Sequence, residues 1–392
     1  MIRGCVMRVK AIDLWDEARG TVSDKFKGYR YIANGVGNDY PSLIELLVGA
    51  SPTAKACAGV IAYFIYGRGF AIERDRREAA KAGGMRFRKD DLYVNEMRET
   101  PNDLLKKVAR SVALHKGAFL HVNYNAAGEK VSVRVLPYRN CRLGERDSNG
   151  YVSKVLVYND WEERLDKRQR DDAVRVLDRY DPRAEVIGAQ VERAGGWDRY
   201  GGQVFFLNLD RNDSYPLAWA DVVMQECESE RLSAKYTKNG FKKGFFGTYA
   251  FVTPMMEDEK LRSEFREELR KSIGVEAEQS VFHFEAELQG DKLEEQVLIE
   301  PIESNVKADL FEYADKKTAN NIRKAYGNVP LVLIDYVEGK LGNTSGEALA
   351  EARAFMKEQM QEERQDVQEM FEELFDNFHR RLSENGVFEI LI

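Results

Sequence analysis

The chain has 392 residues, of which 43% are hydrophobic and 32% are charged. This composition provides enough apolar surface for a sizeable core and for two or more domains, which excludes a disordered chain. The 59 Lys and Arg residues against 66 Asp and Glu residues give a formal net charge of -7, which argues against general attraction to nucleic-acid phosphates.

The sequence predicts no membrane anchor, secretion signal, metal or cofactor. The longest apolar run, Ala54 to Tyr66, is shorter than the roughly 20 residues that span a bilayer, so we expect a buried helix. Met1 to Lys10 carries bases but no continuous hydrophobic segment, unlike a secretion signal. The cysteines form no Cys-x-x-Cys pair and no zinc pattern with the four histidines, so reduced thiols are expected. They are Cys5, Cys57, Cys141 and Cys227.

The first half of the chain predicts an α+β domain. Pro41 to Ile65 has the pattern of a helix or a helix pair broken at Ser51-Pro52, and Thr100-Pro101-Asn102-Asp103 starts a helix that ends at Gly117. Alternating or continuous apolar patterns then predict a series of strands. These strands are Phe119 to Tyr124, Val131 to Val135, Tyr151 to Val157, Val174 to Leu177 and Gln203 to Leu209.

The second half predicts a helical stalk with a small α/β insert at its tip. The first stalk helix follows Tyr215-Pro216 and ends at Asn239-Gly240, the second covers about Ser304 to Tyr326, and a final helix with an acidic face covers Ser345 to about Arg381. The expected elements of the insert are Thr248 to Thr253, a helix from Glu257 to Ile273, and strands at Val281 to Glu287 and Gln296 to Ile299.

A loop from Leu331 to Gly346 separates the second stalk helix from the final helix. Its Gly, Asn, Thr and Ser residues provide turns and a helix N-cap but no catalytic set. We interpret the loop as a mechanical element that two helices project, rather than as an active site.

For each candidate motif, the sequence favours a structural role over a catalytic one. Gly339-Lys340 is followed by Leu341, so it makes no phosphate-binding loop. His121 and Cys141 could meet on paired strands, but no third orienting group is evident and core positions are favoured, as they are for His115, His283 and His379. Acidic clusters could indicate a two-metal nuclease, yet adjacent carboxylates on a helix diverge, which favours solvated faces. These clusters are Glu257-Asp258-Glu259, Glu294-Glu295, Glu362-Glu363 and Glu372-Glu373.

One segment mixes bases with aromatic residues, a combination that suits single-stranded nucleic acid. It contains Lys238, Lys242 and Lys243 with Phe241, Phe245 and Phe246. Given the acidic balance of the chain, we favour a junction between stalk and insert, where the aromatic rings pack and the lysines stay in water.

The order of these elements resembles the portal proteins of tailed double-stranded DNA bacteriophages, the head-tail connector family. The resemblance runs through most of the chain and lies in the collinear order of individually weak signals. They are the helix, glycine and strand of Leu104 to Val122, the hairpin of Gly128 with Val133-Arg134-Val135-Leu136-Pro137, Tyr215-Pro216-Leu217, Asn239-Gly240 before Gly247-Thr248, and Ile322 to Pro330 with its aromatic, glycine and Val-Pro ending.

The resemblance implies a portal-like α+β fold and a non-enzymatic role. Members form a ring, usually of 12 copies, at one capsid vertex, through which double-stranded DNA is packaged and ejected. The implied parts are a mixed α/β wing at 1–213, stem helices at 214–240 and 304–328, a clip at 241–303, a tunnel loop at 331–345, and a long wing helix with minimal crown at 346–392.

The resemblance also implies partners and contact residues. The partners are other copies of the chain, the major capsid protein, the terminase large subunit, a head-tail adaptor and the DNA itself, with no membrane, in a virion assembled in the host cytoplasm. The DNA-facing loop residues would be Asp335, Tyr336, Glu338, Lys340, Asn343 and Thr344. The docking residues of the clip would be Glu257, Asp258, Glu259, Arg262, Arg266, Asp291 and Lys292, and the stem residues Lys238, Lys242, Lys243, Lys316, Lys317 and Arg323.

Two other functions stay open from the sequence. One is a metal-dependent enzyme that processes nucleic acid with some of the carboxylates above. The other is a minor capsid or connector subunit with related helices but no tunnel loop.

Lys340 is the only base in the loop and has two interpretations, a phosphate contact or a solvated lysine. An acidic lining with few bases suits a DNA conduit, because duplex DNA presents a charge every ~1.7 Å of axis and a basic wall would hold it.

Overall fold

We describe the protein from a computed structural model of the chain. The structure describes residues 23–26, 29–83, 88–159, 161, 174–210, 214–242, 248–254, 259–260, 262–264, 267, 281–286, 298–302, 308–335, 343–383 and 387–392. The chain divides into two compact units, the first made of Met1–Met224 with Ile322–Ile392 and the second of Gln225–Asn321.

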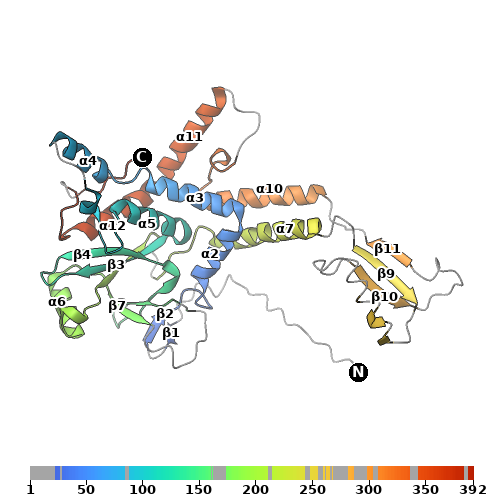
Figure 1. The fold of residues 1–392 in the computed structure, drawn as a ribbon, viewed down its shortest axis with the longest axis horizontal. Helices are drawn as coiled ribbons and strands as arrows, with labels where there is room; N and C mark the ends of the chain where they lie inside the picture. The colour runs from blue at the N-terminus through green and yellow to red at the C-terminus, as the bar shows by residue number, and fades with distance from the viewer. Residues whose placement is uncertain are drawn as a thin grey trace. The chain divides into compact units, whose positions relative to one another are not determined.

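The centre of the first unit is a six-stranded mixed sheet (Figure 1). In spatial order its strands are β4 (Lys130–Leu136), β3 (Gly117–Tyr124), β8 (Gln203–Asn208), β7 (Arg175–Arg179), β6 (Lys154–Val157) and β5 (Cys141–Leu143). Neighbours are antiparallel except for the parallel pair β7 and β8. Its position inside the sheet explains the apolar sequence of β8, where Val204 is fully buried. The predicted α+β class of the first half is confirmed at this level.

A short antiparallel hairpin extends the β5 edge of the sheet. It consists of β1 (Ser23–Phe26) and β2 (Tyr29–Ile32). A bridge between Tyr31 and Gly144 places β2 beside the end of β5.

Two helices of this unit begin and end where the sequence predicts. Helix α2 (Tyr40–Ala50) and helix α3 (Pro52–Tyr66) meet at Ser51, whose side chain accepts a hydrogen bond of 3.0 Å from the Ala54 amide. No single helix in the described part of the chain is long and apolar enough to cross a membrane. Helices α2 and α3 together have the length and composition of a membrane span, but they are bent by 106° relative to each other.

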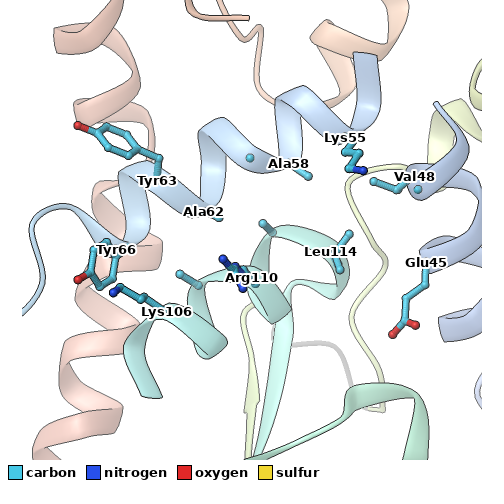
Figure 2. A pocket seen from close by; sticks show the side chains of 14 residues that line it. Glu45, Val48, Lys55, Ala58, Ala62, Tyr63, Tyr66, Lys106, Arg110 and Leu114 are labelled. Carbon is cyan, nitrogen blue, oxygen red and sulfur yellow. The ribbon is translucent and has the colours of Figure 1, made fainter. Parts of the chain in front are cut away.

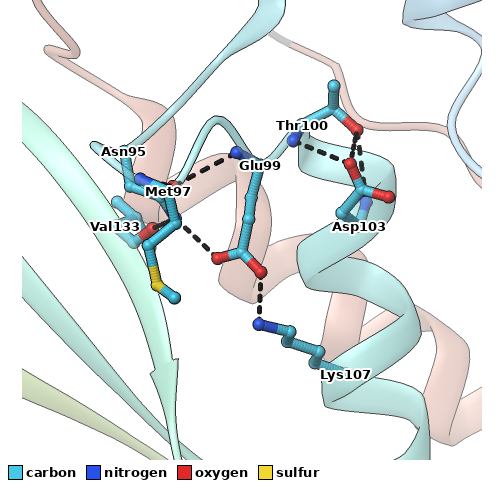
Figure 3. A network of polar contacts seen from close by, with 7 residues as sticks. All are labelled: Asn95, Met97, Glu99, Thr100, Asp103, Lys107 and Val133. Carbon is cyan, nitrogen blue, oxygen red and sulfur yellow. Dashed lines mark hydrogen bonds and ion pairs between the residues drawn. The ribbon is translucent and has the colours of Figure 1, made fainter.

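A capping box begins helix α5 (Pro101–His115). The Thr100 amide donates to the Asp103 carboxylate at 3.0 Å, and the Asp103 amide donates to the Thr100 hydroxyl at 3.3 Å. Just before it, the Asn95 amide group donates to the Val133 carbonyl of β4 at 3.0 Å, and Lys107 of α5 pairs with Glu99 (Figure 3). These contacts fix the start of α5 against the sheet.

Several elements of the first unit were missed or misjudged in the sequence, among them the strands β1, β2 and β5. Helix α4 (Ile72–Ala82) and helix α6 (Ala184–Ala194) were not predicted, because their sequences are dominated by charge or by small residues. The single final helix predicted from Ser345 to Arg381 is wrong: the structure has α11 (Asn343–Gln359) and α12 (Gln361–Phe375), with a break at Met360.

The break at Met360 depends on tertiary contacts. Met360 is fully buried, and Arg364 donates to the Lys357 carbonyl at 2.5 Å and to the Phe64 carbonyl at the end of α3 at 3.2 Å. A side chain thus satisfies a carbonyl next to the break. The helical period of the apolar residues continues across position 360, so periodicity alone cannot show the break.

The second unit contains two helices and a three-stranded sheet. These elements are α7 (Met224–Lys242), α10 (Ala308–Ala325), and the sheet of β10 (Val281–Ala286), β9 (Thr248–Pro254) and β11 (Leu298–Ile302) in that order. Strand β9 is parallel to β10 and antiparallel to β11. The Asn321 side chain of α10 donates to Glu226 of α7 at 3.2 Å, which joins the two helices.

Two predicted ends in the second unit were wrong. Helix α7 continues through Asn239-Gly240 to Lys242, and β11 ends at Ile302 rather than at Ile299. The predicted starts at Ser304 for α10 and at Gln296 for β11 lie outside the described residues. An Asn-Gly pair favours a turn locally, but a long preceding helix extends across it because each added residue gains a backbone hydrogen bond. Most of the helix predicted from Glu257 to Ile273 lies outside the described residues.

A buried arginine fastens the β5 edge to the start of α2. Arg142 is 1% exposed, and its guanidinium donates to both oxygens of Asn38, to the Arg139 carbonyl at 2.9 Å and to the Cys141 carbonyl at 2.8 Å. The ring of Trp161 lies 5.2 Å away. All of these acceptors are neutral, so the arrangement depends on the forked geometry of the guanidinium.

We predict that Arg142→Lys lowers the free energy of unfolding by about 2–4 kcal/mol, because an ammonium group cannot reach all of these buried acceptors. Urea titration measures the loss. The matched control is Arg139→Lys, whose exposed ion pair with Glu45 should be worth less than about 0.5 kcal/mol. Equal losses in the two variants would contradict the assigned role of Arg142.

Candidate functional site

The base of the predicted loop is a tightly held turn at the end of α10. Ile322, Tyr326 and Val329 are all fully buried. Gly327 and Asn328 have positive φ angles of 79° and 56°, a conformation that ends helices and reverses the chain. Arg323 accepts a hydrogen bond from the Val329 amide at 3.2 Å through its carbonyl, and donates one to the Val329 carbonyl at 2.8 Å through its side chain. The helix end predicted from the Tyr-Gly-Asn-Val-Pro sequence is therefore confirmed.

The loop itself is shorter than predicted. Leu331–Leu333 forms a 3₁₀ turn that contacts α11, and the Asp335 amide donates to the Leu331 carbonyl at 2.9 Å. Helix α11 already begins at Asn343, before the predicted start at Ser345. The sequence misses the 3₁₀ turn because three consecutive aliphatic residues have no periodicity of their own.

The predicted DNA-facing residues are only partly visible in the structure. Asp335 follows the 3₁₀ turn and is exposed. Asn343 and Thr344 belong to the first turn of α11. Tyr336, Glu338 and Lys340 lie outside the described residues.

The predicted stem and clip residues divide between the two units. Arg323 belongs to the first unit, where it braces the loop base; it is therefore occupied by a structural contact. Lys238 on α7 and Lys316 and Lys317 on α10 are exposed in the second unit, as is Glu259, and Arg262 is half-buried. Lys242 is the last residue of α7. The predicted residues outside the described part are Lys243, Glu257, Asp258, Arg266, Asp291 and Lys292.

The histidine and cysteine that could have formed a nucleophilic pair are far apart in the sheet. His121 lies on β3, where its Nε2 is 2.7 Å from the Gly201 carbonyl, and Cys141 lies on β5, with three strands between them. The Cys141 thiol donates to the Pro137 carbonyl at 3.5 Å, and burial raises its pKa. Both are core residues, as predicted. In the described part of the chain, no three His, Cys, Asp or Glu residues are grouped to hold a metal ion.

His115 is also a core residue. Its ring is 3% exposed and stacks on Tyr138 with 4.4 Å between centroids, and its Nε2 lies 3.3 Å from a Glu45 carboxylate oxygen. Burial lowers the pKa of His115 below that of a free histidine, as it does for His121.

The exposed face of α11 and the start of α12 is acidic. It carries five exposed glutamates and two exposed bases, namely Glu347, Glu351, Glu358, Glu362, Glu369, Arg353 and Lys357. The predicted solvated cluster Glu362-Glu363 holds only in part. Glu362 is exposed, whereas Glu363 is partly buried and its pKa is raised by burial.

A groove on the first unit was not predicted from the sequence. It has a volume of about 710 Å³ and lies along α2, α3 and α5 (Figure 2). Small residues of α3 and α5 form its floor, including Ala58, Gly59 and Ala62 on α3 and Ala109 and Ala113 on α5. The spacing of four between small residues on both helices is the signal that could have found it.

Basic and aromatic side chains border this α3–α5 groove. Lys55, Lys106 and Arg110 are exposed along it. Tyr63 is 60% exposed, and the Lys106 ammonium lies 5.3 Å from the centroid of the Tyr66 ring. Glu45 lies on the α2 side of the groove, where His115 and Arg139 contact its carboxylate. The groove is therefore apolar at its floor and positive along its rim.

Comparison with known proteins found no matching family model and no matching curated protein. Among solved structures, the chain is similar to one in the virion of a native gene transfer agent particle, with TM-score 0.41, 13% identity and coverage of 79% of this chain and 74% of that one. It is similar to a chain in the neck of the native particle computed with C12 symmetry, with TM-score 0.40, 13% identity and coverage of 81% and 74%.

A third similar structure is an HK97 family phage portal protein from Corynebacterium diphtheriae, with TM-score 0.37, 9% identity and coverage of 78% of this chain and 81% of that one. The family that the sequence resembles is thus among the structures found.

We predict opposite effects for two glycines on either side of the loop. Gly327→Ala should lower the melting temperature, with a cost of about 1 kcal/mol, because the φ of 79° is unfavourable for alanine while the nearest atom to the new Cβ, in Gln359, is an ordinary 3.6 Å away. Gly346→Ala, in open space on α11, should raise it or leave it unchanged. A thermal melt of each variant tests this, and a loss at both positions would contradict the assignment.

We predict that stability falls as the pH drops below about 6.5, because the unfolded chain binds protons that the buried His115 and His121 do not. The slope is at most about 1.4 kcal/mol per pH unit for each histidine. Urea titrations at pH 7.5 and 5.5 should give a smaller pH dependence for His115→Gln combined with His121→Gln. The exposed His379→Gln serves as control. An unchanged slope in the double variant would refute the prediction.

Proposed function

We propose that this protein is a portal protein, the subunit of a ring-shaped channel at one capsid vertex through which double-stranded DNA enters and leaves a virion. The observation that carries the proposal is the loop base at the end of α10. Before the loop, the end of α10 is buried and the chain reverses at Gly327-Asn328, and after the loop α11 begins at Asn343. The described residues on both sides of the loop anchor it and include no catalytic group.

The rigidity of the loop base supports a mechanical role. Tyr326 and Val329 are buried on either side of the positive-φ pair, and Arg323 hydrogen-bonds to Val329 from both its main chain and its side chain. A loop that contacts moving DNA needs a rigid base. A flexible base would move with the DNA, and the loop would not hold its position.

The charge of the neighbouring helix supports DNA as the cargo. The exposed face of α11 carries more glutamates than bases, and the whole chain has a formal net charge of -7. Counterion release makes each basic contact with duplex DNA favourable, so a basic lining would hold the DNA in place. An acidic lining weakens those contacts and lets DNA move.

The proposal assigns the other parts of the chain to assembly. Copies in a closed ring meet through two different surfaces, so each copy presents one patch to each neighbour. We propose 12 copies, the first unit as the wing with the tunnel loop, and the second unit as stem and clip. The terminase large subunit and the head-tail adaptor would dock at the clip, and the major capsid protein around the ring. The role is structural and not enzymatic, and the site of action is the virion.

We predict that the purified protein forms rings with a central hole in negative-stain images. Deletion of 335–344 should leave the rings intact, because it spares the buried loop base, but DNA packaging or retention of packaged DNA should be lost. Replacement of the same residues by a Gly-Ser linker of equal length is the matched control for chain length, and should lose the same function. Compact monomers that cleave DNA in the presence of a divalent metal would overturn the proposal. Rings whose packaging survives the deletion would instead indicate a minor connector subunit.

A further inference from the structure

The α3–α5 groove has the shape and the lining to receive a helix. Its floor consists of small residues on two neighbouring helices, namely Ala58, Gly59 and Ala62 on α3 and Ala109 and Ala113 on α5. A Cβ atom added at Gly59 would meet nothing within 4 Å, so the middle of the floor is open. How closely two helices pack depends on the side chains between them, and small residues allow the closest approach. A third helix could therefore lie along α3 and α5 with a large side chain directed at this floor.

Three exposed bases follow the rim of the groove at defined intervals. Figure 2 shows Lys106 at one end, Arg110 in the middle and Lys55 at the other end. The Lys106 ammonium lies 5.3 Å from the centroid of the Tyr66 ring, so these two residues mark the same end. At ~1.5 Å per helical residue, Arg110 lies about 6 Å beyond Lys106 on α5, and Lys55 lies about 17 Å beyond Tyr66 on α3. Positive charge thus recurs at about 0, 6 and 17 Å along the groove.

An exposed stripe on helix α11 carries the complementary charges. This acidic stripe consists of Glu347, Glu351 and Glu358, which are exposed, and of Phe355, which is 42% exposed. At about 100° per residue, the four side chains fall within about 80° of arc round the helix. Measured from Glu347, the other two glutamates lie about 6 Å and about 17 Å along the helix axis. The acids of the stripe therefore recur at the same intervals as the three bases of the groove.

The packing of α11 keeps the acidic stripe away from the groove of its own chain. Ala352 and Met356 are buried on another side of α11, which contacts α3, α12 and the 3₁₀ turn. In Figure 1, α5 lies below α3 and α11 lies above it. Arg353 and Lys357, two residues before and after Phe355, lie about 160° away from it round the helix and stay clear of the stripe. The stripe that reaches a groove therefore belongs to another copy.

We propose that α11 of a neighbouring copy lies in the α3–α5 groove and runs in the same direction as α5. In this register each glutamate of the acidic stripe meets one base of the rim. The pairs are Glu347 with Lys106, Glu351 with Arg110, and Glu358 with Lys55. Phe355, about 12 Å along the stripe, would then lie on the floor at the level of Ala58 and Gly59.

The contact would link the copies in one direction. Each copy offers its groove to one neighbour and its acidic stripe to the other, which is the heterologous contact that closes into a ring or continues as a chain. The inference rests on the proposed function only for that closure. The contact covers three of the five exposed glutamates of this face, and Glu362 and Glu369 stay uncovered for the proposed DNA channel.

Photo-cross-linking of the full-length protein tests the proposal. Phe355→p-benzoylphenylalanine keeps an aromatic group at the position, and after irradiation we expect covalent dimers and higher multimers whose cross-linked peptides map to α3 or α5. The matched control is Arg353→p-benzoylphenylalanine, on the other side of α11, which should give no cross-link to either helix.

Charge reversal tests the register. Lys106→Glu combined with Arg110→Glu should reduce the cross-linking yield at least about fivefold. Lys81→Glu, at an exposed base of α4, should leave the yield unchanged. Adding Glu347→Lys and Glu351→Lys to the groove variant should restore the yield, which also shows that the groove variant is folded.

Cross-links within single chains, cross-links that map elsewhere, or a yield insensitive to charge reversal or to charge exchange would each overturn the proposal. Negative-stain images of the same samples separate it from the proposed function. Rings without groove cross-links refute the docking alone, whereas groove cross-links in samples that form no rings refute the proposed function alone.

Discussion

The burial of α3 is the constraint on which the rest of the first unit depends. Cys57, Ile61 and Ile65 on this helix are fully buried, and α3 contacts α2, α5, α11 and α12. One helix therefore carries the packing between the N-terminal helices over the sheet and the C-terminal helices that follow the loop. The opposite side of α3, with its small residues, is left for the groove.

The end of α3 shows how this packing is fastened by hydrogen bonds. The Arg68 amide donates to the Leu391 carbonyl, which leaves the Phe64 carbonyl to Arg364 of α12. The C-terminal segment then continues along this edge, where the Leu391 amide donates to Gly69 and Ala71 donates to Glu389. Gly67 has no room for a side chain here, because a Cβ atom would lie 2.2 Å from the Leu391 carbonyl oxygen. Residues more than 300 positions apart thus complete one another's backbone hydrogen bonds.

The loop base and the groove are two consequences of the same packing. The buried end of α10 and the break at Met360 bring α11 beside the 3₁₀ turn of Leu331–Leu333. The groove forms because α3 and α5 meet through alanine and glycine rather than through large side chains. Both features therefore depend on contacts between helices that are distant in the sequence.

Features that depend on a few neighbouring residues could be predicted from the amino-acid sequence. The capping box at Thr100 and Asp103, the break at Ser51-Pro52 and the turn at Gly327-Asn328 each depend on side chains or backbone preferences within a few residues. The core character of His115, His121 and Cys141 also followed from the absence of an orienting partner. Other features became evident only from the fold: the break at Met360, the extension of α7 through Gly240, the bracing role of Arg323 and the existence of the groove. Each of these depends on what another part of the chain places against a segment, such as the guanidinium of Arg364 on a carbonyl near Met360, and contacts between distant residues leave no periodic trace in the sequence.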